Sequence, residues 1–397
     1  MSETRKRNHK RITSDDVETL GSLSSPMAVS SGHSRARKSR RRKSSAITAA
    51  KSSSNESKAA SQPKTKASCT KTEPSNKSGN YSYTMRMILS PAKTLNLDKD
   101  ADGLPLGWTQ PLLSLQSQRT QVVAALKNHA SSSTKLGALL KTSAKISTTA
   151  KGYWEDMSKD GASHPVDQRK PAIMTFAGFA YAGLEVRDQI AEEPKALRYL
   201  QDHLRIVDPL YGWLRPMDAI EAYRLEMASK GVFDNDDSMK CSDVDKKLAL
   251  HNFWKPSIKT CLLEETNEVN EGNNDDNKTP ILIVNLASDE YSVAVDHPYN
   301  AKIVFRSGGR TVAVHAKRAR GLMVRYAALH GIETVEGLQA FDSEGYSYQP
   351  EASTWESSGG MQGLMTMDDT PKTSRKKKKP EPPTLVFDRP GTWKKSS

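Results

Sequence analysis

Short blocks of this sequence combine charged side chains with the turn-forming residues that could hold them in place. Lys93 belongs to the block 90–95, Ser-Pro-Ala-Lys-Thr-Leu, which directly follows the apolar run 85–89. A strand that ends in a loop of hydroxyls, backbone N–H groups and a lysine is typical of a site for an anion such as phosphate. The glycines of a P-loop are absent, and an ordinary surface turn with a solvated lysine is an equal alternative.

The block Tyr211–Met227 is unusually dense in aromatic and charged residues. A glycine and a proline in this block indicate a shaped turn that can hold Arg215 in a fixed place. If 223–227 is a strand, Arg224 and Glu226 share one face and the larger apolar residues share the other. A fixed Arg–Glu pair can orient charge in a binding site, although a structural ion pair is the commoner use of such a pair.

A third block, 285–291, follows the clearest buried strand of the sequence, the apolar run 281–285. Ligands and catalytic groups often lie just beyond the carboxyl ends of such strands. The polar residues of the block could bind a cation, position a water molecule or accept from an amine. They are Asn285, Ser288, Asp289 and Glu290. The alternative is a helix start, with Ser288 as the N-cap and two acids in the first turn.

Residues 317–330 are expected to form a helix with one apolar stripe. At about 100° per residue, three cations fall on one arc with Gly321, opposite that stripe. The three are Lys317, Arg318 and Arg325, and Arg320 lies in the same block. Because Gly321 has no side chain, a phosphate backbone or an anionic ligand can approach the helix over it. A solvated amphipathic helix is the alternative.

The elements that must position these blocks alternate irregularly between strands and helices, so the expected class is α+β. Strands are expected at 86–90, 171–176, 281–285 and 384–387. Residues 301–305 and 311–315 are expected to pair as a hairpin. The acidic, Asn-rich run within 262–279 is expected to be an inserted loop.

The basic character of the chain lies in its ends. The formal net charge is +13, yet residues 1–84 alone hold 18 Lys and Arg against 6 Asp and Glu, and 85–350 are slightly acidic. Residues 1–84, and most of 351–397, have few large apolar side chains to bury and are expected to be disordered. The domain with a buried core is therefore expected at 85–350, with a last strand contributed by the second tail.

Two dense basic clusters lie in these tails, at Arg35–Lys43 and Arg375–Lys379. Each could bind a nuclear import receptor or contact nucleic acid, and a solvated tail is the alternative. The sequence has no apolar run long enough for a membrane span and no secretory signal. The cysteines and histidines show no metal-ligand spacing, so no metal site and no cofactor are expected.

Taken in order, these blocks resemble the bacterial peroxide-stress protein YaaA family. The resemblance rests on 90–95, 210–218, 223–227, 285–291, 316–323 and 341–346, and it covers about 85–350 with the strand at 385–387. The family pattern has a lysine and an aspartate beside one glycine, where this chain reads Ala177-Gly178-Phe179. The basic tails and the acidic run lie outside the pattern, which favours a eukaryotic setting.

The resemblance implies a single mixed domain with a positively charged cleft. It also implies a cytosolic role in limiting oxidative damage by lowering free iron, and binding to double-stranded DNA. No established reaction comes with it, so no catalytic residue follows. Two hypotheses stand: the chain binds double-stranded DNA or another polyanion, or the same cleft holds an anionic small molecule, as an enzyme or as a binder. The basic clusters add the nucleus to the cytoplasm as a location.

Overall fold

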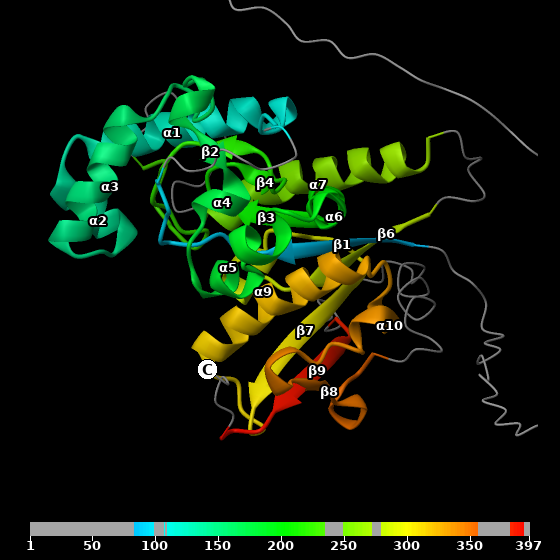
Figure 1. Cartoon of the computed structure of the whole chain (residues 1–397). Coiled ribbons are helices and arrows are strands. Elements are labelled where there is room, and N and C mark those ends of the chain that lie inside the picture. The colour runs from blue at the N-terminus through cyan, green and yellow to red at the C-terminus, as the bar shows by residue number, and fades with distance from the viewer. Residues whose placement is uncertain are drawn as a thin grey trace, which may run out of the picture. The chain divides into compact units, whose positions relative to one another are not determined.

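The computed structural model describes residues 83–98, 107, 109–234, 249–271, 279–355 and 382–392. These residues form one mixed domain around a seven-stranded sheet (Figure 1). Its strands are β1 (Thr84–Leu89), β3 (Leu204–Asp208), β4 (Gly212–Leu214), β6 (Ile281–Asn285), β7 (Asn300–Ser307), β8 (Ser347–Tyr348) and β9 (Thr384–Arg389). The single mixed domain expected from the sequence is confirmed.

The sheet is mostly parallel. The strand order is β4-β3-β1-β6-β7-β9-β8, with β4 and β8 running antiparallel at the two edges. In β6, every residue of Ile-Leu-Ile-Val-Asn is buried, as expected for a parallel strand that is covered on both faces. The expected strands at 86–90, 281–285 and 384–387 are confirmed, and the last one continues to Arg389. The expected strand at 171–176 is wrong, because Ala172–Thr175 form a short helix.

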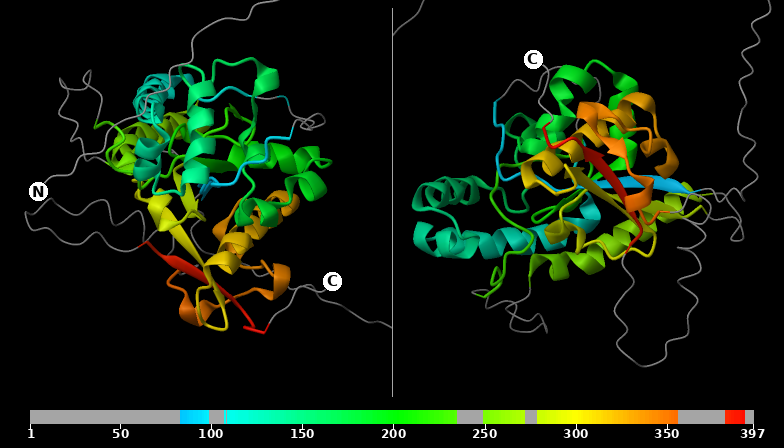
Figure 2. Two further views of the ribbon diagram at one scale, coloured as in Figure 1. Left: turned by 90° about the vertical axis from the view of Figure 1, so that its left-hand side faces the viewer. Right: turned by 90° about the horizontal axis from the view of Figure 1, so that it is seen from below.

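Ten α-helical segments surround this sheet in the described ranges. They are α1 (Gln116–Ala130), α2 (Ser133–Leu140), α3 (Ala144–Asp156), α4 (Ala172–Thr175), α5 (Phe179–Leu184), α6 (Pro194–His203), α7 (Leu250–Val269), α8 (Asp289–Ser292), α9 (Ala313–His330) and α10 (Val335–Leu338). Figure 2 shows α7 and α9 on opposite sides of the sheet. α6 begins with Pro194, whose fixed φ suits a first turn, and α9 ends where Gly331 adopts a φ of 59°.

Smaller elements complete the described part of the fold. β2 (Lys170–Pro171) and β5 (Ala219–Ile220) form a two-stranded antiparallel ribbon. A π-helical segment, Val186–Ile190, follows α5. Short 3-10 segments lie at Leu113–Leu115, Val166–Gln168, Ser343–Gly345 and Pro350–Ala352. None of the helices in the described ranges is long and apolar enough to cross a membrane.

The contact between α5 and α9 depends on two glycines. A β-carbon at Gly321 would lie 1.7 Å from the carbonyl oxygen of Ala180, and one at Gly183 would lie 2.2 Å from the carbonyl oxygen of Arg318. The two backbones meet only because these side chains are missing. Gly321 is therefore a buried packing position, and the expectation that an anion approaches α9 over it is wrong.

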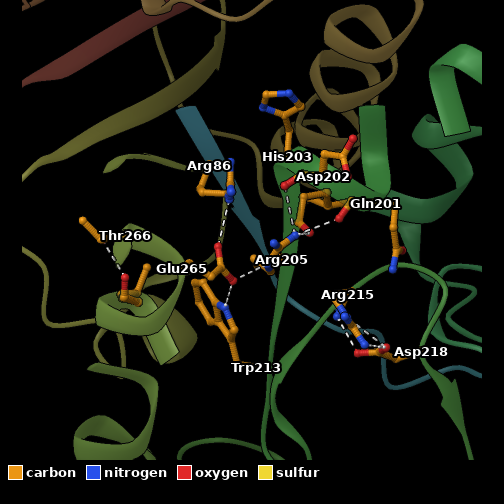
Figure 3. Close-up of polar contacts among 12 residues, drawn as sticks. Arg86, Gln201, Asp202, His203, Arg205, Trp213, Arg215, Asp218, Glu265 and Thr266 are labelled. Carbon is orange, nitrogen blue, oxygen red and sulfur yellow. Dashed lines mark hydrogen bonds and ion pairs between the residues drawn. The ribbon is translucent and has the colours of Figure 1, made fainter. Parts of the chain in front are cut away.

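The acidic run expected as an inserted loop at 262–279 is partly helical. α7 continues to Val269, so the expectation is wrong for that part, and 272–278 lie outside the described residues. The reason is that Glu265 points at the sheet instead of into solvent (Figure 3). Its carboxylate accepts hydrogen bonds from Nε of Arg86 at 2.9 Å, Nε of Arg205 at 2.7 Å and the indole N–H of Trp213 at 2.7 Å.

The electrostatics of Glu265 follow from these partners. Burial acts to raise the pKa of its carboxyl group, but the guanidinium of Arg205, and after it that of Arg86, hold the pKa below the usual range. Both arginines are themselves buried, so the carboxylate of Glu265 and the two guanidinium groups compensate one another's charge away from water. This cluster fastens α7 to β1 and β3.

The expected hairpin between 301–305 and 311–315 is wrong. β7 pairs in parallel with β6 on one side and with β9 on the other, and α9 already begins at Ala313. An isolated bridge between Ser307 and Arg310 is what remains of the turn. Apolar residues alternate in both 301–305 and 311–315, which favoured a hairpin. The strand that pairs with β7 is instead β9, which is distant in sequence.

Candidate functional site

The loops that follow β1 and β6 run in opposite directions from the carboxyl ends of these two strands. The next strand of the large sheet after β1 is β3, on one side, and the next strand after β6 is β7, on the other. Because β1 and β6 are parallel neighbours, their carboxyl ends lie at the same edge. In open sheets of this kind, ligands bind in the crevice where such loops diverge. A cavity of about 260 Å³ lies there.

Side chains from three distant segments converge on this cavity. Five of those expected at a site from the sequence line it: Lys93, Ser288, Glu290, Lys317 and Arg320. The first follows β1, the next two follow β6, and the last two belong to the first half of α9. Ser90 also lines the cavity, and Phe179, Tyr181 and Tyr291 contribute aromatic walls.

Hydrogen bonds fix the two loops against each other. The backbone N–H of Ser288 donates to Oγ of Ser90 at 2.9 Å, and the two hydroxyl oxygens lie 3.3 Å apart. The hydroxyl of Tyr181 donates to the carbonyl oxygen of Ser90 at 3.2 Å. Gly178 lets α5 approach closely, since a β-carbon there would lie 2.9 Å from that of Ala92. Contacts within the protein therefore hold the walls of the cavity in place.

Lys93 is held by the segment 223–227. Its Nζ lies 2.5 Å from a carboxylate oxygen of Glu226, and Nη1 of Arg224 donates to its carbonyl oxygen at 3.0 Å. Burial alternates along 223–227 as expected, with Arg224 and Glu226 on the more open side. The segment is irregular and is not a strand, so that part of the expectation is wrong.

Arg320 is the cation whose surroundings most favour an added anion. Burial lowers its pKa, and the attraction of Asp289 opposes this change. Its Nε is buried and has no hydrogen-bond partner in the described part of the chain. Asp289 is mostly exposed and is engaged by Lys302 at 2.8 Å. Because a buried N–H without an acceptor costs free energy, an acceptor atom supplied by a ligand would stabilise this site.

The other polar groups at or near the cavity differ in whether they already have hydrogen-bond or ion-pair partners within the protein. Glu290 accepts from the backbone N–H of Ala228 at 3.3 Å. Lys317 is exposed, and the described residues place no ion-pair partner beside it. Asn285 does not line the cavity: its side-chain oxygen accepts from the N–H of Ala287 at 3.0 Å and so shapes the loop after β6.

Arg215, which was expected at the site, lies elsewhere. Its side chain pairs with buried Asp218 at 2.9 Å and also donates to the carbonyl oxygen of Gln110 at 2.9 Å. Figure 3 shows Arg215 and Asp218 facing each other, apart from the Glu265 cluster. These contacts close the turn between β4 and β5, which is a structural role.

Arg318 and Arg325 do not line the cavity either. Glu185, at the end of α5, pairs with both, and Arg318 also pairs with Glu344 at 2.7 Å. Burial acts to raise the pKa of Glu185, but the hydrogen bonds from Arg318 and Arg325 hold it below its usual range. The expected basic arc is therefore wrong, because acids from other elements neutralise two of its three cations.

Sequence reasoning missed Asp208, which is fully buried at the carboxyl end of β3. Its carboxylate accepts from the N–H groups of Leu210 at 2.8 Å and Tyr211 at 2.9 Å, and from the hydroxyl of Tyr223. Burial raises the pKa of Asp208 to about 6, although these hydrogen bonds act to lower it. An acid placed directly after the apolar residues of β3 is the signal that could have found it.

The arrangement is suited to holding a compact anion with several acceptor oxygens. A guanidinium N–H, two ammonium groups and two hydroxyls border the same space, and charge-assisted hydrogen bonds of this kind are the strong ones. Within the described ranges, no group of three or more His, Cys, Asp or Glu side chains is placed to hold a metal ion.

Comparison with known proteins bears on the whole domain. The sequence pattern of the family described as peroxide stress protein YaaA matches residues 85–352. A UPF0246 protein of Acaryochloris marina is 35% identical over 278 residues, which is 68% of this chain and 96% of that protein. UPF0246 proteins of Marinomonas sp. (33% identical, 68% and 94% covered) and Bordetella avium (34% identical, 68% and 96% covered) are similar in the same way. The chain therefore belongs to the peroxide stress protein YaaA family, which gives it a general role in peroxide stress.

Proposed function

We propose that this chain limits oxidative damage during peroxide stress and that it binds a small anion in the cavity between the loops after β1 and β6. The observation that carries the proposal is half-buried Arg320, whose buried Nε lacks an acceptor at the wall of that cavity. Lys317 and the hydroxyls of Ser90 and Ser288 border the same space. A phosphate group offers enough oxygens to meet all of them at once.

A calorimetric titration of the full chain with inorganic phosphate tests this proposal. Replacing Arg320→Gln removes the charge and should weaken binding about ten- to a hundredfold, since a hydrogen bond to a charged group contributes about 1.5–3 kcal/mol. Arg198→Gln, at an exposed position on α6, is the matched control and should bind as the unchanged chain does. Phosphate binding that is equal in all three proteins would refute the proposal.

Double-stranded DNA is a second candidate partner, favoured by the cations where β7 gives way to α9. Arg310 and Lys317 are exposed, Arg306 is half-buried, and the first turn of α9 contains no acid. Cations in such positions can contact phosphates of a duplex without neutralisation by their own helix.

The salt dependence of duplex binding tests this second candidate. Arg310→Gln and Lys317→Gln should each reduce the slope of log affinity against log salt by about 1, as expected for one lost phosphate contact. Arg198→Gln again serves as the control. If neither variant changes the slope, the junction of β7 and α9 is not the DNA-binding surface.

We also propose that the protein protects the cell by lowering the concentration of free intracellular iron. This proposal is testable by the electron paramagnetic resonance signal of chelated ferric iron in cells with and without this chain after a peroxide pulse. A lower signal in the cells that contain the chain supports the proposal, and equal signals contradict it.

We also propose that the basic clusters at Arg35–Lys43 and Arg375–Lys379, both outside the described residues, bind a nuclear import receptor. Replacing the cations of both clusters by glutamine in a fluorescent fusion should move the protein from the nucleus to the cytoplasm. A distribution that does not change on replacement would contradict this role.

A further inference from the structure

Phe179 is an exposed aromatic side chain at the wall of the cavity. It is 53% exposed, whereas Tyr181 and Leu184 of the same short helix are buried. Single exposed apolar residues are common on protein surfaces and need no explanation by themselves. This ring, however, borders the same cavity as Arg320 and Lys317, so an apolar face and cationic groups are available to one ligand.

The size of the cavity limits what can enter it. Its volume of about 260 Å³ lies below the roughly 300–1,000 Å³ of pockets that enclose drug-sized ligands. One compact group fits inside, and the remainder of a larger ligand must lie at the rim. The half-exposed ring of Phe179 is placed to cover such a remainder.

Two of the three acids near the cavity oppose an anion less strongly, because each is paired with a lysine. Glu226 is paired with Lys93, and Asp289 with Lys302. Glu290 accepts a backbone hydrogen bond from Ala228. Lys317 and Nε of Arg320 have no such partner among the described residues, so they are the groups left for a ligand.

We infer that the cavity binds a nucleotide, with the phosphate against Arg320 and Lys317 and the base stacked on Phe179. The inference rests on the proposed binding of an anion in this cavity and adds the aromatic part of the ligand. Stacking of a base on an aromatic side chain raises affinity by roughly five- to a hundredfold and is tolerant of base identity. A base inside a duplex is covered on both faces, so the ring belongs to a free mononucleotide or to an unpaired strand end.

The test compares ligands that add one part at a time. The full chain is titrated with inorganic phosphate, ribose 5-phosphate, adenosine 5′-monophosphate and a 5′-phosphorylated single-stranded oligonucleotide. Adenosine monophosphate should bind roughly five- to a hundredfold more tightly than ribose phosphate. Phe179→Leu keeps an apolar side chain but removes the ring, and should abolish that difference. Phe179→Trp should retain it, and inorganic phosphate should bind all three proteins equally.

The outcomes separate this inference from the proposed function. If neither adenosine monophosphate nor the oligonucleotide binds more tightly than ribose phosphate while phosphate binds, the stacking on Phe179 is refuted and anion binding stands. If phosphate and all the other ligands fail to bind, both are refuted. If only the oligonucleotide binds more tightly than ribose phosphate, the ligand is an unpaired strand end. If adenosine monophosphate also binds more tightly, the ligand is a free nucleotide. Because Phe179 is half-exposed, thermal unfolding of the variants should match that of the unchanged chain, which checks that each is folded.

Discussion

Glu265 of α7 accepts a hydrogen bond of 2.7 Å from Nε of Arg205 in β3, and its second oxygen accepts one of 2.9 Å from Nε of Arg86 in β1. One carboxylate thus neutralises two buried cations on neighbouring strands. β1 is also the strand whose loop carries Lys93 into the cavity, so the cluster supports the sheet from the face opposite α9 (Figure 2).

Replacing Glu265→Gln should lower the free energy of unfolding by about 3–5 kcal/mol, because two buried guanidinium groups then lose their counter-charge. Urea denaturation measures this change. Glu264→Gln, one residue earlier and exposed in the same helix, should change stability by less than about 0.5 kcal/mol. Equal effects of the two replacements would show that the cluster does not stabilise the fold.

Replacing Gly321→Ala should destabilise the protein by about 3 kcal/mol or more, since the added carbon meets the backbone of Ala180 and α5 and α9 must separate. Gly152→Ala in α3 is the matched control, because nothing lies within 4 Å of a β-carbon there. The control should stabilise the helix by up to about 1 kcal/mol. Thermal or urea unfolding gives both values, and a Gly321→Ala protein as stable as the control would contradict the close contact.

Asp208 should make stability depend on pH between about 4 and 6. Its pKa is raised to about 6 in the folded protein by burial, whereas in the unfolded chain it ionises near its ordinary value of 3.8. The folded state therefore holds the proton more tightly. The stability that this group contributes is full below about pH 4 and is lost as the pH rises through 6, by about 3 kcal/mol at most.

Asp208→Asn isolates this effect. The amide oxygen can still accept from the N–H groups of Leu210 and Tyr211, and the amide nitrogen can donate to the hydroxyl of Tyr223. The variant should therefore gain stability relative to the unchanged chain on going from pH 4 to pH 7. A difference between the two proteins that is constant over this range, measured by urea denaturation, would contradict the raised pKa.

Part of the site could be predicted from sequence because it depends on local order along the chain. Lys93, Ser288 and Glu290 directly follow apolar runs that form parallel strands, and parallel neighbours place their carboxyl ends together. Lys317 and Arg320 lie on a helix whose existence the apolar stripe predicts.

The rest depends on contacts between segments that are distant in sequence. A helical projection places Arg318 and Arg325 beside Gly321, but it does not show that Glu185 neutralises both cations. In the same way, composition marks Glu265 as part of an acidic run, while its two arginine partners lie 60 and 179 residues away. Such pairings follow only from the folded arrangement.

A crystal structure of the full chain grown with phosphate would show whether Nε of Arg320 receives an anion in the cavity between the loops after β1 and β6. We expect a phosphate oxygen within about 2.7–3.2 Å of Nε of Arg320, with Lys317 beside the same group. Phosphate bound only at other positions, with Nε of Arg320 still lacking an acceptor, would contradict this expectation.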